Sequence, residues 1–172
     1  MTQPSRQEAV RILEEGQSRL DELIASLSGD DLTRPSTIGS GDWSAKDLIG
    51  HVAFWEELAL KTVGEWRGGE KPEVEQVFAS GGPDDLNAQN YERKRDWPLD
   101  RVREEAGETH RRLIREIEEM ADEEWASKAP YVAERRNRLV TQLGSVLGAP
   151  KQPFGHAFAH IPDLEAYATS LR

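Results

Sequence analysis

Apolar residues recur at helical spacing from the start of the chain, and the first series predicts a helix. Its members are mostly three or seven residues apart and stop before Ser28 and Gly29: Val10, Leu13, Leu20, Leu23, Ile24 and Leu27. This spacing places apolar side chains on one face of a helix. The following segment, residues 32–43, is dense in Gly, Pro, Ser and Thr, which favour turns, so we expect a loop there.

The second helix has the clearest pattern. Ser44 can cap its amino terminus, and Asp47 lies in the first turn, where an acidic side chain is favourable. Gly68 and Gly69 end the pattern. The apolar face repeats in steps of three and four residues: Leu48, Val52, Trp55, Ala59, Thr62 and Trp66.

A third long helix is expected to begin at Trp97 and Pro98, because proline is favourable in a first turn. Glutamate and arginine fill most of its other positions, as on a solvated face. Its apolar positions are Leu99, Val102, Ala106, Leu113, Ile117 and Met120. Before it, residues 83–95 have the pattern of one short helix.

The carboxyl-terminal part of the chain is less regular. Residues 121–152 contain Gly144, Gly148 and Pro150, so we expect a loop with some helix there. The last helix is predicted to begin near Pro153, with Pro162 as a local kink. Its inner face carries His156, His160, Leu164, Tyr167 and Leu171.

Together these elements predict one domain over residues 1–172 with an all-α fold. A chain of 172 residues suits one core, and no sequence repeat divides it. We expect a four-helix bundle with a long, decorated connection before the last helix.

The composition restricts the partners. The chain has 32 acidic and 22 basic side chains and a formal net charge of -10. Such a charge repels phosphate backbones and anionic lipids, so we expect no nucleic-acid partner, no membrane partner, and a small-molecule substrate instead. No segment has the ~18 apolar residues of a membrane span, and no secretory signal is evident, so we expect a cytoplasmic protein. Because the chain has no cysteine, any thiol chemistry must use an external thiol.

Three of the four histidines are expected to point inward. His156 and His160 lie one turn apart on the apolar face of the last helix, and His51 flanks the apolar face of the second. Three neutral imidazoles from two helices suit a zinc, nickel or iron ion with one open position. A set of hydrogen-bonded core histidines is the alternative. His110 lies at the edge of an apolar face, and we expect a surface or boundary residue there rather than a ligand.

Other catalytic motifs are absent from the sequence. Ala157 follows His156, where zinc proteases with an H-E-x-x-H helix carry glutamate. The chain has no G-x-S-x-G motif, no phosphate-binding glycine loop and no cysteine pair. Metalloprotease, serine-hydrolase, nucleotide-binding and dithiol redox functions are therefore disfavoured.

The segments GDWSAKDLIGHVAFWE and GHAFAHIPDLEAY, with NAQN between them, resemble the DinB/YfiT-like superfamily over nearly the whole chain. The resemblance implies a left-handed four-helix bundle, often a homodimer, that holds nickel, zinc or a similar divalent ion such as iron or manganese. It implies that His51, His156 and His160 are the metal ligands. Relatives include bacillithiol S-transferases, and the amino-terminal domain of mycothiol-dependent maleylpyruvate isomerase is similar. This chain departs from the pattern at Ala159, where glutamate often precedes the last histidine, and in its long segment before the last helix.

The leading hypothesis is a metal-dependent thiol S-transferase or hydrolase that acts on a small electrophile. Two alternatives stay open. One is a non-catalytic, metal-stabilised bundle that acts as a stress or dimerisation protein, and the other is a metal-free bundle whose histidines pair with carboxylates. The candidate pocket residues are Trp55, Asn87, Asn90 and Phe158.

Overall fold

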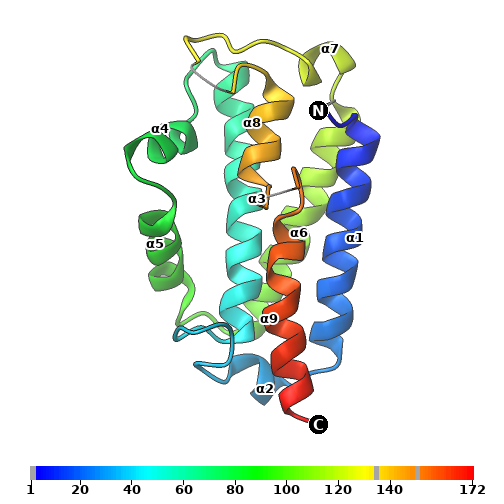
Figure 1. Cartoon of the computed structure of the whole chain (residues 1–172), viewed down its shortest axis with the longest axis vertical. Helices are drawn as coiled ribbons and strands as arrows, with labels where there is room; N and C mark the ends of the chain where they lie inside the picture. Colours follow the sequence, from blue (N-terminus) through cyan, green and yellow to red (C-terminus); the bar gives the residue numbers. More distant parts are fainter. Residues whose placement is uncertain (1–2, 134–135, 150–151) are drawn as a thin grey trace.

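The computed structural model describes residues 3–133, 136–149 and 152–172, and the regular elements of these residues are helices. Four long helices run side by side along the molecule (Figure 1): α1 (Arg6–Ala25), α3 (Ala45–Arg67), α6 (Leu99–Glu119) and α9 (His156–Ser170). Shorter helices connect them: α2 (Gly29–Thr33), α4 (Glu73–Ser80), α5 (Asp84–Lys94), α7 (Asp122–Trp125) and α8 (Leu139–Val146). The prediction of an all-α fold is confirmed.

Local sequence signals fix the start of α3. The Ser44 hydroxyl accepts a hydrogen bond from the Asp47 backbone amide at 3.2 Å. In return, the Asp47 carboxylate accepts one from the Ser44 amide at 2.8 Å. This reciprocal cap satisfies two of the free amides at the helix start. It also fixes where the second turn of α3, which carries His51, begins.

The connections contain more helix than the sequence predicts. The helix α2 overlaps the start of the predicted loop at 32–43, and a cap from Ser28 to Asp31 stabilises it. The helix α4 lies between Gly69 and residue 83, where the sequence pattern predicts no helix. Both helices are too short to show several turns of apolar periodicity, which is the signal that a sequence search uses. The short helix expected within residues 83–95 is present as α5.

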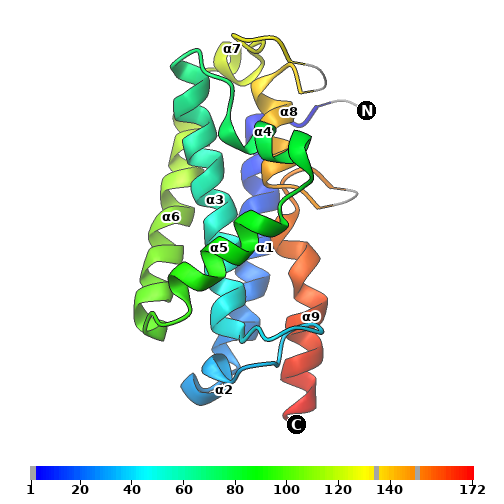
Figure 2. The same cartoon turned by 90° about the vertical axis from the view of Figure 1, so that its left-hand side faces the viewer.

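The last helix of the bundle is interrupted. The helices α8 and α9 follow one another along the same line in both views (Figure 1, Figure 2). The His156 amide donates a hydrogen bond to the Leu147 carbonyl at 2.9 Å, so the helix resumes beside the point where it stopped. The predicted start near Pro153 is therefore too early, because α9 begins at His156. Leu171, expected on the inner face, is 40% exposed because it lies beyond the end of α9.

Phe154 anchors the chain just before α9. Its φ of 63° lies in the left-handed region, which is unfavourable for a residue with a side chain. Its ring is 1% exposed and stacks on Trp125 with the ring centroids 5.6 Å apart. Burial of this ring offsets the backbone strain and holds the chain two residues before His156.

The core consists of two apolar clusters along the bundle. The first includes Trp55, Leu113 and Leu143, and the second includes Leu48, Val52 and Leu164. Because Val52 and Trp55 belong to different clusters, the second turn of α3 lies where the clusters meet. The helix α5 packs on the outer side of α3, as Figure 2 shows.

Candidate metal centre

Three histidines converge between α3 and α9. His51 is 5% exposed, and its ring centroid is 5.0 Å from that of His156 and 4.9 Å from that of His160. The centroids of His156 and His160 are 4.8 Å apart. One ring nitrogen of each histidine lies within 4.8 Å of the chosen nitrogens of the other two. The structure thus brings together the three histidines that the sequence singles out.

Burial keeps these imidazoles neutral. It lowers the pKa of His51 to about 2, and the neighbouring rings of His156 and His160 contribute to this shift. Burial also lowers the pKa of His156 to about 3, with a smaller contribution from His160. The pKa of His160 is lowered by burial too, although the Asp163 carboxylate opposes the shift. Neutral imidazoles have a lone pair that can bind a cation.

The hydrogen bonding of the three rings fits a metal centre. Nδ1 of His51 and Nδ1 of His156 are buried without a hydrogen-bond partner among the described residues. Nε2 of His156 and Nε2 of His160 are 3.1 Å apart. Two ligand nitrogens of a tetrahedral zinc ion are about 3.3 Å apart, so this pair already has a suitable separation. One ring nitrogen of His51 lies within 4.8 Å of this pair, so the three rings surround one common space.

Aromatic side chains flank the histidine cluster. The ring centroid of Trp43 is 4.8 Å from that of His51, and Trp43 stacks on Tyr91 of α5 at 6.4 Å. On another side, the centroid of Trp55 is 6.0 Å from that of His156. These apolar rings limit the access of water and keep the local dielectric constant low, which strengthens electrostatic interactions.

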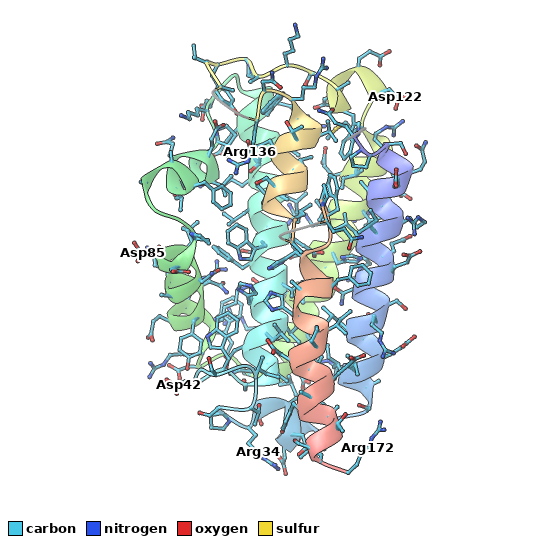
Figure 3. All side chains as sticks on the ribbon, in the orientation of Figure 1. Arg34, Asp42, Asp85, Asp122, Arg136 and Arg172 are labelled. Carbon is cyan, nitrogen blue, oxygen red and sulfur yellow. The ribbon has the colours of Figure 1, made fainter. Side chains whose placement is uncertain are left out.

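The helices α4 and α5 hold one of these aromatic walls. Trp55 stacks on Phe78 of α4 with centroids 6.0 Å apart, and its Nε1 donates a hydrogen bond to Oδ1 of Asn87 at 3.0 Å. Cζ of Arg136 lies 5.0 Å from the Phe78 ring centroid, and Figure 3 shows Arg136 between α4 and α8. The guanidinium group of Arg136 is therefore close enough to the Phe78 ring for a cation–π interaction, and the Phe78 ring in turn stacks on Trp55.

The four candidate pocket residues have different positions. Trp55 and Asn87 belong to the wall of the cluster. Asn90 is buried, and its Nδ2 donates to the Gly50 carbonyl at 3.4 Å, so it ties α5 to α3. The ring of Phe158 packs on α1, where a Cβ atom added to Gly16 would lie 3.3 Å from it. Asn90 and Phe158 therefore make structural contacts between helices, Asn90 between α5 and α3 and Phe158 between α9 and α1.

Three wall residues, Trp43, Phe78 and Tyr91, were not among the sequence candidates for the pocket. Phe78 lies on α4, which the apolar periodicity did not predict. Tyr91 lies four residues after Asn87 on α5, so the two share a helix face. That spacing is the signal that would have identified Tyr91.

His110 lies outside the cluster. Its Nδ1 is 2.8 Å from Oε1 of Glu56, a buried carboxylate on α3. In the part of the chain that the structure describes, His110 is the one histidine that pairs with a carboxylate at hydrogen-bond distance. This position agrees with the expected boundary residue, and it makes His110 a natural control for the other three.

Comparisons with known proteins identify the fold. The family model described as the DinB superfamily matches residues 12–163. The crystal structure of an uncharacterised protein from Escherichia coli UTI89 superposes with a TM-score of 0.74 at 14% identity, covering 99% of this chain and 96% of that one. The crystal structure of the colibactin self-resistance protein ClbS in complex with a dsDNA superposes with a TM-score of 0.71 at 16% identity, covering 95% of this chain and 98% of that one. No curated protein matches the sequence significantly.

One expectation about partners is corrected by these comparisons. The exclusion of nucleic acid is wrong, because ClbS, a protein of the same fold, is in complex with a dsDNA. The physical reason is that net charge is a sum over the whole surface and does not describe the local patches that meet a phosphate backbone. In the described part of the chain, no helix is both long enough and apolar enough to cross a membrane.

Proposed function

The chain belongs to the DinB superfamily, and from this premise we propose that it is a metal-dependent enzyme. In this proposal His51, His156 and His160 hold a divalent ion, with nickel or zinc as the first candidates and iron or manganese as alternatives. The reaction is transfer of an external low-molecular-weight thiol to a small electrophile, or hydrolysis of such a molecule. The observation that carries the proposal is the convergence of three imidazoles with lowered pKa values, His51 being buried and His156 and His160 half-buried.

The ligand set favours an anionic sulfur or oxygen in the open position. Three neutral histidines do not compensate the charge of a divalent ion, so an anion is favoured as the next ligand. When bound, the ion supplies Lewis acidity and lowers the pKa of a thiol or a water molecule beside it. Because the chain has no cysteine, the sulfur must belong to a second substrate.

The residues around the cluster orient and shield the reactants. Trp43 and Trp55 lie on two sides of the histidines and keep water away from the reacting atoms. The hydrogen bond from Trp55 to Asn87 fixes the orientation of the indole ring. Flat aromatic faces suit an apolar electrophile, which explains how a site with few charged groups selects its substrate.

The proposal is tested by metal reconstitution. Tag-free protein is stripped with a chelator, reloaded separately with nickel, zinc, iron or manganese, and mixed with 1-chloro-2,4-dinitrobenzene and a panel of small thiols. We expect turnover that depends on the metal and disappears in His51→Ala. The matched control is His110→Ala, which removes a histidine outside the cluster and should keep the metal and the activity. Equal rates with and without metal would contradict the proposal.

A non-catalytic role is the second candidate. The cluster joins α3 to α9, the two elements that an ion would tie together. A purely structural ion would raise the melting temperature without producing turnover with any thiol or electrophile. The same reconstituted samples therefore separate the two roles.

Double-stranded DNA is included as a further arm of this test. The fold neighbour ClbS is described as a self-resistance protein and is in complex with a dsDNA. Fluorescence anisotropy of a labelled duplex at low and at physiological salt would measure DNA binding by this chain. Binding that weakens as salt rises would indicate contacts to phosphates.

The single domain over 1–172, the homodimer and the cytoplasmic location stay predictions. Light scattering coupled to size-exclusion chromatography, with and without metal, would measure the oligomeric state. A single cooperative transition by calorimetry would support one domain.

A further inference from the structure

A groove between α1, α3 and α6 is separate from the histidine cluster. It has a volume of about 540 Å³, and its lining contains none of His51, His156 and His160. Sites for small molecules have volumes of about 300–1,000 Å³, so the groove has the size of such a site. The helix α3 borders both sites, with His51 toward α9 and Glu56 toward the groove.

Small residues create this groove. Ala53 of α3 and Ala106 and Gly107 of α6 line it, where longer side chains would fill the space between the helices. Glycine inside a helix costs about 1 kcal/mol relative to alanine. A Cβ atom at Gly107 would lie 3.2 Å from Nη1 of Arg111, so the end of this arginine would have to shift slightly. Leu20, Ile24 and Val52 give the groove an apolar floor.

A carboxylate–imidazole pair stands in the wall of the groove. Glu56 is 5% exposed, and its Oε1 is 2.8 Å from Nδ1 of His110. A carboxylate only accepts hydrogen bonds, so the proton in this contact belongs to Nδ1 of His110. In the tautomer with its proton on Nδ1, Nε2 is a hydrogen-bond acceptor. Among the described residues, Nε2 of His110 has no hydrogen-bond partner, and His110 lines the groove. The groove thus presents Nε2 of His110 beside apolar side chains.

The charged groups around His110 come from three helices. Glu56 belongs to α3, Arg103 and Arg111 to α6, and Asp21 to α1. Glu14 and Glu22 of α1 line the adjoining part of the surface beside His110. The acidic residues of α1 disfavour a ligand that enters with full negative charge. The arginines of the rim favour negative charge on a bound ligand, and the acidic residues of α1 oppose it, so recognition of the ligand depends on its hydrogen bond to His110.

We propose that this groove binds a small apolar molecule with one weakly acidic hydroxyl group, which is a phenol. The ligand enters neutral and its O–H group donates to Nε2 of His110. The proton then moves to Nε2, and the electron pair of the O–H bond stays on the ligand oxygen. The resulting imidazolium ring lies between the Glu56 carboxylate and the ligand anion and donates a charge-assisted hydrogen bond to each.

The test uses 4-nitrophenol, whose visible absorption reports the phenolate form. 4-Nitrophenol is titrated into the protein at a pH slightly below the ordinary pKa of the free phenol. A chelator is present throughout, so that no metal ion occupies the histidine cluster. We expect saturable binding together with an increase in phenolate absorption. The control ligand is 4-nitroanisole, which has the same ring but no ionisable hydroxyl, and it should bind at least about tenfold more weakly.

Variants connect the signal to the groove. His110→Gln and Glu56→Gln should each lower the affinity for 4-nitrophenol about tenfold or more and remove the phenolate signal. Ala106→Leu narrows the groove without changing a polar group and should also weaken binding. Arg112→Gln, an exposed change on α6 outside the groove lining, should bind as the unmodified chain does. Circular dichroism melting curves confirm that each variant is folded.

Three results would overturn this proposal. The first is equal affinity for 4-nitrophenol and 4-nitroanisole, because the hydroxyl would then not be recognised. The second is unchanged binding in folded His110→Gln and Ala106→Leu, which would place the ligand elsewhere. The third is binding without saturation.

Discussion

Nε2 of His156 and Nε2 of His160 face each other at 3.1 Å across one turn of α9. With both rings neutral, one of these two nitrogens must carry a proton for the contact to be a hydrogen bond. A cation that accepts both lone pairs gives the same separation without that proton. The distance between the two nitrogens therefore fits either a bound cation or a shared proton. A measurement of metal binding distinguishes these two states.

Removal of one histidine should abolish tight metal binding. We expect one ion per chain by isothermal titration calorimetry, and a loss of affinity of at least about 100-fold in His51→Ala, His156→Ala or His160→Ala, because two ligands remain from three. The control His110→Ala should keep one ion per chain. Unchanged affinity in His51→Ala would show that α3 does not take part.

The stability of the metal-free protein should fall as the solution becomes more acidic. The ordinary pKa of histidine is about 6.5, whereas burial lowers the pKa of His51 to about 2 and that of His156 to about 3. Below about pH 6.5 the unfolded chain therefore binds protons that the folded chain does not, and the free energy of unfolding falls by up to about 1.4 kcal/mol per pH unit for each histidine.

Urea unfolding at about pH 7 and about pH 5, with chelator present, measures this loss. The double variant His51→Phe with His156→Leu has two fewer buried titrating groups and should show a smaller loss. Equal losses in the variant and the unmodified chain would mean that other groups set the acid sensitivity.

Phe154→Ala should destabilise the protein and weaken metal binding together. The ring of Phe154 is 1% exposed, and truncation of a buried phenylalanine costs about 3–5 kcal/mol. The substitution also leaves a left-handed residue without the packing that offsets its strain, so the start of α9 and the position of His156 become less fixed. Calorimetry measures stability, and titration with zinc measures the affinity.

The matched control for Phe154 is Val132→Ala. Val132 is 92% exposed, so its truncation should change stability by less than about 0.5 kcal/mol. If Phe154→Ala lowered stability but left metal affinity intact, the role of Phe154 in positioning His156 would be refuted.

Lys94→Met should cost about 2 kcal/mol. The Lys94 side chain is 4% exposed, and its Nζ lies 2.6 Å from Oε2 of Glu105 and 3.4 Å from Oε1 of Glu57. Its loss leaves the Glu105 carboxylate without a cation, whereas Glu57 keeps its ion pair with Arg93 at 3.0 Å. The partial exposure of both carboxylates keeps the cost below that of a fully buried pair.

A double-mutant cycle with Glu105→Gln checks the origin of this cost. Removal of one carboxylate from the Lys94→Met background should restore about half of the lost stability in urea unfolding. A purely additive result would mean that Lys94 acts through its apolar stem alone.

The histidine cluster shows which features of the site could be predicted from local sequence patterns. His156 and His160 share a face because they lie one turn apart, and this follows from helix geometry alone. The inward direction of His51 follows from its place beside the apolar face of α3. The aromatic wall was only partly predictable, since Phe78 lies on a short helix with too few turns to show periodicity.

The sequence by itself determined α1, α3 and α6, because their apolar faces are local features that each segment carries within its own residues. It also determined that three histidines lie toward the interior. Only the tertiary structure decided that α3 and α9 become neighbours, that α9 begins at His156 after an interruption, and that small residues leave a groove beside His110. These features depend on contacts between segments far apart in the chain, and local spacing contains no information on which faces will meet.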